Sequence, residues 1–159
     1  MSRLVMVLSA LLFALPAWAG DLKPRDGWAV YPTTQGYEAL VKSVREAVKS
    51  NGLIVVTQAG PTKAAANRGI TIPGNRIIGV FNNDFAVRVL KTSTAAMIEA
   101  PIRLYVTENP DGSATLSYKL PSHVLAPYGD EGGAELAAIA QELDAKFQAI
   151  AETATQLSH

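Results

Sequence analysis

The segment Gly60–Arg76 holds the residues whose types and spacing best suit the binding of a charged ligand. Pro61 stands where a short helix is expected to begin, because proline at a first helical position loses no hydrogen bond. The free amides of a first helical turn carry partial positive charge and bind anions. Lys63 and Asn67, four residues apart, would share one face of this helix. We expect a carboxylate or phosphate of a small ligand to be bound by Thr62, Lys63, Asn67 and Arg76. The alternative is an ordinary helix start whose basic side chains lie in solvent.

Glu99 and His123 are the residues best suited to general acid–base chemistry. Glu99 lies in the apolar stretch Met97–Pro101, where burial favours a protonated carboxyl group that can act as an acid. His123 is the only histidine inside the expected domain, and catalysis would need a nucleophile and an orienting acid beside it. In the simpler interpretation, Glu99 accepts backbone hydrogen bonds at a strand start and His123 lies on the surface.

Aromatic residues on the expected strands offer a second kind of binding surface. Tyr105, Tyr118 and the segment Trp28–Tyr31 would line one face of a sheet. A concave, mostly apolar pocket is the usual form of a small-molecule site. Ordinary packing between strands is the alternative.

The composition excludes several kinds of chemistry. The chain contains no cysteine, which rules out disulfides, thiolate metal sites and haem attached through thioethers. No G-x-S-x-G nucleophile motif is present, and one interior histidine does not make a metal site of three or four ligands. No cofactor is therefore expected. The 14 basic and 14 acidic side chains are interspersed, which argues against nucleic-acid binding.

Hydrophobic periodicity in the first half of the chain predicts alternating strands and helices. Apolar residues recur at spacings of three and four on the first helix, and the strands are runs rich in β-branched residues. In chain order we expect a strand at Trp28–Tyr31 that Pro32 ends, a helix from Tyr37 to Asn51-Gly52, a strand at Leu53–Thr57, a short helix at Thr62–Arg68, a strand at Arg76–Phe81 and a helix capped by Asn82-Asn83-Asp84.

The second half predicts a hairpin followed by a long helix. Apolar and polar residues alternate over 102–107 and 115–120 around the turn Asn109–Gly112, with one face buried and one face in solvent. A final helix is expected after Gly132-Gly133, with an apolar stripe from Leu136 to Ile150. Because regular β–α alternation is lost, we expect an α+β fold: a mostly antiparallel sheet of four to five strands covered by helices, in a single compact domain over 28–153. Residues 154–159 are expected to form a tail.

The first residues have the pattern of a signal peptide for export. Arg3 precedes an apolar run, Leu4–Leu15, and Ala17-Trp18-Ala19 is a cleavage site of the A-x-A type. The run is shorter than the ~20 residues that span a bilayer, and no later run approaches that length. We therefore expect a signal peptide at 1–19, a flexible lead-in at 20–27, and a periplasmic or secreted protein without a membrane-inserted segment after cleavage.

Three ordered segments also resemble a known family. They are Asn51-Gly52-Leu53, Asn75–Asn82 (Asn-Arg-Ile-Ile-Gly-Val-Phe-Asn) and Ala100–Val106 (Ala-Pro-Ile-Arg-Leu-Tyr-Val). Over Tyr31 to Ala151 the chain resembles the bacterial domain of unknown function 302 family. The resemblance implies a compact α+β fold with an antiparallel sheet, in small and often dimeric proteins, and it implies no activity.

The chain departs from this family at three places. Many relatives carry a histidine near the turn that reads Gly60-Pro61-Thr62 here, a cysteine where Phe81 stands, or Asn-Pro where Asn82-Asn83 stands. Any metal or redox chemistry that those residues support in relatives is absent from this chain.

These observations favour a periplasmic binding or interaction module over an enzyme. Its expected ligand is small and either anionic or apolar, and a homodimer is expected from the resemblance. The alternative is a small periplasmic hydrolase or isomerase that uses Glu99 and His123, and a structural accessory subunit is the third possibility.

Export gives the first test. When the protein is produced in a bacterial host and recovered from the periplasm, its N-terminal residue should be Gly20, because cleavage follows Ala19. Intact-mass spectrometry measures this directly, and a mass that retains residues 1–19 would contradict it.

Overall fold

The computed structural model describes residues 22–156, so the predicted signal peptide at 1–19 lies outside the described residues. The strands form one five-stranded sheet in the order β1-β5-β4-β3-β2, and every neighbouring pair is antiparallel. Their bounds are β1 (Trp28–Gly36), β2 (Ile54–Ala59), β3 (Asn75–Phe81), β4 (Ile102–Glu108) and β5 (Ser113–Lys119). The predicted α+β class with an antiparallel sheet is confirmed.

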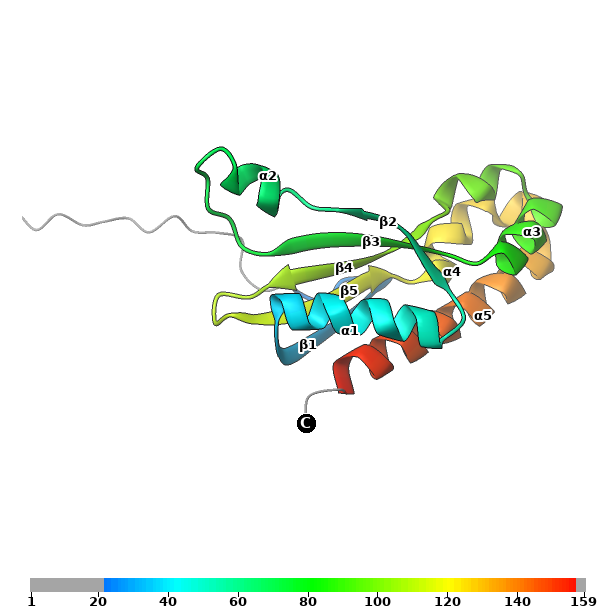
Figure 1. The fold of residues 1–159 in the computed structure, drawn as a ribbon. Helices are drawn as coiled ribbons and strands as arrows, with labels where there is room; N and C mark the ends of the chain where they lie inside the picture. The colour runs from blue at the N-terminus through cyan, green and yellow to red at the C-terminus, as the bar shows by residue number, and fades with distance from the viewer. Residues whose placement is uncertain (1–21, 157–159) are drawn as a thin grey trace, which may run out of the picture.

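The helices lie mainly on one side of this sheet. Figure 1 shows α1 and α5 side by side along one face, with α3 near the far end of α5 and α2 away from both. The helices are α1 (Tyr37–Ser50), α2 (Thr62–Ala66), α3 (Asn83–Thr92), α4 (Pro121–Leu125) and α5 (Gly129–Gln156), with 3₁₀ turns η1 (Ala95–Glu99) and η2 (Ala126–Tyr128). We call the side of the sheet turned away from α1 and α5 the open face; Trp28, Ile77, Arg103, Tyr105 and Lys119 lie on it.

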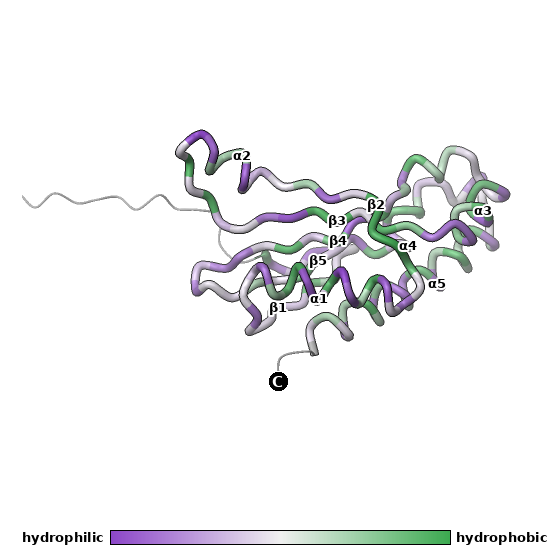
Figure 2. Tube along the Cα trace, viewed as in Figure 1, coloured by the Kyte–Doolittle hydropathy of each residue, from purple (hydrophilic) through white to green (hydrophobic). Residues whose placement is uncertain are grey.

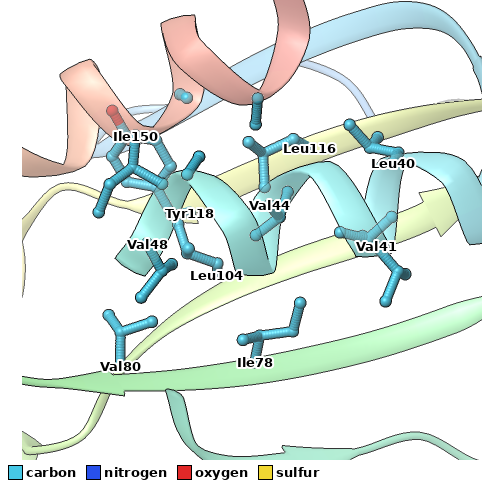
Figure 3. Packing of buried hydrophobic residues seen from close by; sticks show 14 of the residues in the cluster. Leu40, Val41, Val44, Val48, Ile78, Val80, Leu104, Leu116, Tyr118 and Ile150 are labelled. Atoms are coloured by element: carbon cyan, nitrogen blue, oxygen red, sulfur yellow. The ribbon is translucent and has the colours of Figure 1, made fainter. Parts of the chain in front are cut away.

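The core fills the space between the sheet and the helical layer. Polar and apolar residues alternate along α1 (Figure 2), and its apolar side buries Leu40, Val44 and Val48 completely. These side chains point at the strands (Figure 3), where Ile78 and Leu104 are equally buried. The apolar positions of the predicted stripes are buried, among them Val44, Leu104, Val106 and Phe147.

Two predicted boundaries differ from the structure. β1 continues through Pro32 to Gly36, because β1 is an edge strand and a missing N–H is tolerated there; its pairing with β5 shifts register after Pro32. The last helix begins at Gly129, before the kink at Gly133, and it continues to Gln156. Ala154, placed in the tail by the sequence, is completely buried in the core.

The expectation that one face of the hairpin is wet was wrong for β5. Thr115 and Ser117 belong to the open face, yet both are buried. β5 is an inner strand, and Ser117 is paired with Val30 on one side and Tyr105 on the other. The larger neighbouring side chains therefore cover the small residues between them.

The absence of a side chain at Gly79 allows Pro101, which follows η1, to lie directly on the open face of the sheet. Gly79 of β3 pairs with Thr57 of β2. A Cβ atom at Gly79 would lie 2.2 Å from the Thr57 hydroxyl oxygen and 3.0 Å from Cγ of Pro101. The Pro101 ring therefore rests on Gly79, and this contact holds the end of η1 against the open face.

The packing of α1 can be tested by placing a charge in it. Val44→Asp should lower the free energy of unfolding by about 3–5 kcal/mol, because the carboxylate would be buried without a partner. Arg45→Asp, an exposed change on the same helix, should change it by less than about 0.5 kcal/mol. Urea unfolding of both variants measures the difference, and equal effects would reject the helix register.

The contact at Gly79 gives a second test. Gly79→Ala should destabilise the protein by about 1–3 kcal/mol, since Thr57 or Pro101 must move to make room. Gly129→Ala is the matched control, because Gly129 has helical backbone angles and no atom within 4 Å of the added carbon. Thermal unfolding of the pair checks this, and a stable Gly79→Ala protein would show that Pro101 is not closely packed there.

Candidate functional site

A pocket of about 300 Å³ opens on the open face of the sheet. We call it the open-face pocket. Strands β1, β3, β4 and β5 supply most of it, while η1 and α4 border it. Its lining residues are Trp28, Ile77, Glu99, Ile102, Arg103, Tyr105, Tyr118, Lys119 and Val124.

Strand register brings the basic and aromatic residues of this pocket together. Trp28 is paired with Lys119 across β1 and β5. The β4–β5 register, which pairs Leu104 with Tyr118, places Arg103 opposite Lys119. Trp28, Lys119 and Arg103 thus form one row across three strands. Tyr105 lies in the next row, where it is paired with Ile77.

Lys119 of this row and Arg25, which precedes β1, both lie over the Trp28 ring. The Lys119 ammonium lies 5.9 Å from the centre of the Trp28 ring, and the Arg25 guanidinium lies 5.2 Å from the same centre. Both are cation–π distances. Among residues 22–156 the ion pairs are Lys42–Glu46 and Arg88–Glu142, neither of which lies in the pocket.

Tyr105 and Ser117 add polar groups to the open face. The Tyr105 hydroxyl accepts a hydrogen bond from Nδ2 of Asn75 at 2.5 Å, which fixes the ring against the sheet. Ser117 lies beside Tyr105, and its hydroxyl is the one buried side-chain polar atom of the described residues without a hydrogen-bond partner. An unpaired buried hydroxyl costs free energy unless a water or ligand satisfies it.

Glu99 supplies the acidic group of the pocket. Its Oε1 accepts a hydrogen bond of 2.7 Å from the Tyr128 hydroxyl, and this bond raises the pKa of Tyr128. Glu99 and Ile102 also line a second, apolar cavity of about 50 Å³ that runs between α3, η1 and the end of the sheet. Glu99 therefore borders both cavities.

The aromatic residues predicted from the sequence lie partly in the pocket. Trp28 and Tyr105 face it. Tyr118 contributes to the lining, but its register places the side chain on the helical side. There its ring stacks on Tyr31 and packs against Phe147, and burial raises its pKa. Arg103 and Lys119 were missed, because charged residues on the outer side of a hairpin usually serve only solvation.

The four residues of the predicted anion site are not assembled around a pocket. Thr62 donates a hydrogen bond to the carbonyl of Pro73, while Lys63 and Asn67 are exposed on or just after the short α2. Arg76 shares the side of β3 that carries the buried Ile78, so it faces the helical layer. There its Nε donates to the Tyr37 hydroxyl at 3.5 Å. None of the four lines either cavity described above.

Glu99 and His123 do not meet in the open-face pocket. His123 is exposed on α4, and its ring lies over Gly27, where a Cβ atom would be 2.3 Å from it. In the part of the chain that the structure describes, no three histidine or acidic side chains are grouped closely enough to hold a metal ion. No helix within 22–156 is long and apolar enough to cross a bilayer.

Comparison with known proteins places the chain in a family. No curated protein matches its sequence. A crystal structure of an uncharacterized conserved DUF302 protein from Bacillus stearothermophilus is similar in fold, with a TM-score of 0.70 and 19% sequence identity over 82% of this chain and 99% of that one. The family model described as domain of unknown function DUF302 matches residues 30–154. The sheet, its helical layer and this match agree, and the chain belongs to the DUF302 family.

Proposed function

We propose that this protein is a periplasmic binding module that holds a small organic ligand in the open-face pocket. The observation that carries the proposal is the convergence of aromatic, basic and acidic side chains on one cavity of about 300 Å³. This volume is at the lower end of the usual range for ligand pockets, ~300–1,000 Å³, so the ligand is small.

The pocket has the rigidity that a binding site needs. Its floor comes from paired strands, and sites built on strands are positioned more accurately than sites on loops. Trp28 and Tyr105 supply large contact areas at a low cost in conformational entropy. The Pro101–Gly79 contact holds the wall that carries Glu99.

The enzymatic alternative has less support. Glu99 has a hydroxyl partner in Tyr128, but His123, the other residue on which a hydrolase or isomerase would depend, lies outside the pocket.

The proposed periplasmic location rests on the predicted signal peptide. The homodimer stays a prediction, and the outer edge of β2 is where a second copy would pair: it is uncharged and proline-free, unlike the proline-bearing edge at β1.

The fluorescence of Trp28 tests ligand binding directly. Trp18 and Trp28 are the two tryptophans of the chain, and Trp18 belongs to the predicted signal peptide, so the protein cleaved after Ala19 has Trp28 as its single reporter. Titration with benzyl alcohol, benzamide and benzoate at up to millimolar concentration should give a saturable change for at least one compound. Ile77→Ala should weaken that binding by roughly fivefold, because the truncated side chain lies in the pocket.

Ile70→Ala is the matched control, since Ile70 and Ile77 have similar exposed fractions, 43% and 39%, and Ile70 does not line the pocket. It should leave binding unchanged. The proposal fails if no compound gives a saturable response, or if the two isoleucine variants bind equally weakly.

A further inference from the structure

We infer that the ligand of the open-face pocket is a small organic monoanion, an apolar or aromatic carboxylate whose charged group lies between Arg103 and Lys119. This inference rests on the proposed function and names the ligand class. It depends on three features of the pocket: two facing cations, the absence of a neutralising acid beside them, and an apolar floor.

The two cations face each other on neighbouring strands. The β4–β5 register places Arg103 opposite Lys119 on the same face of the sheet. Like charges at directly opposite positions of an antiparallel pair repel each other and destabilise the pairing. A carboxylate bound between them replaces this repulsion with two charge-assisted contacts, and the guanidinium of Arg103 offers it a fork of donors.

No acid of the described chain neutralises these cations. Both side chains belong to exposed residues, and the two ion pairs within 22–156 lie elsewhere. Of the acids within 22–156, Glu99 alone lines the pocket, and one of its oxygens accepts the hydrogen bond from Tyr128. With Arg103 and Lys119 against Glu99, the lining has an excess of positive charge.

The rest of the lining selects an organic anion with a single charge. Ile77, Ile102 and Val124 offer carbon surface that an inorganic anion would leave unused. Glu99 borders the pocket from η1 instead of from the row of cations, so it repels a second negative group on the ligand.

Four probes separate charge from shape in the protein cleaved after Ala19, in which Trp28 is the single tryptophan. Benzoate should bind at least about tenfold more tightly than benzamide, its uncharged analogue of nearly the same shape. Terephthalate, which carries a second carboxylate, and inorganic phosphate should both bind more weakly than benzoate. Added salt should weaken benzoate binding and leave benzamide binding unchanged, because screening acts on charge.

Substitutions then locate the charge preference. Arg103→Gln and Lys119→Gln should each reduce benzoate affinity toward that of benzamide, while benzamide affinity stays within about twofold. Arg45→Gln, which removes an exposed cation from α1 on the other side of the sheet, should change neither affinity. The comparison of probes on the protein without these substitutions keeps the test valid if a pocket variant folds poorly.

The outcomes distinguish this inference from the proposed function. If benzamide binds as tightly as benzoate, the pocket binds ligands but the anion inference is wrong. If phosphate binds as tightly as benzoate, the site is an inorganic anion site and the organic part of the inference is wrong. If benzyl alcohol binds and none of the four probes does, the proposed function stands and the inference is wrong. If benzyl alcohol does not bind either, both fail.

Discussion

The apolar stripe of α1 packs against the sheet and shares one core with β3, β4 and β5. This contact decides which face of the sheet stays open. Side chains alternate between the two faces of a strand, so each residue that faces α1 leaves its neighbours on the open face. Tyr118 packs against Phe147 of α5, while its neighbours Ser117 and Lys119 lie on the other side. A slip of one residue in the register of β5 would exchange these roles and remove both the core and the site.

Much of the fold follows from local patterns in the sequence. The spacing of apolar residues predicted α1, alternation predicted the hairpin, and the expected cap at the start of α3 is confirmed because the Asn82 side chain accepts hydrogen bonds from the amides of Asp84 and Phe85. The end of β1 was harder to predict. Proline is a strand breaker in general, and only the edge position of β1, which is a property of the whole sheet, makes Pro32 acceptable.

The site was harder to predict than the fold, because it is formed by pairing between distant segments. Alternation alone places Tyr105 on an outer face. That Arg103 and Lys119 lie opposite each other, however, follows only from the register of β4 and β5. Arg76 shows the reverse case. Arg76 lies at the start of β3, close to the short α2, as expected. The alternation of side chains along β3, however, directs Arg76 to the helical side of the sheet, where it contacts Tyr37. Spacing in the sequence predicts which residues are close along the chain. The side of the sheet that each strand residue faces is set by which residues are buried in the core.

The pairing of β1 with β5 joins the first strand of the chain to the last, and the pocket straddles that pairing. Contacts between such distant segments carry a large loop-closure cost and form slowly. Trp28 enters the pocket from β1, whereas Arg103 enters it from β4. A ligand that contacted both would bridge the edge strand β1 and the central strand β4. Under the proposed function, a ligand that binds the folded protein and not the unfolded chain would stabilise the pairing of β1 with the sheet by mass action, so retention of β1 and ligand binding would be thermodynamically linked.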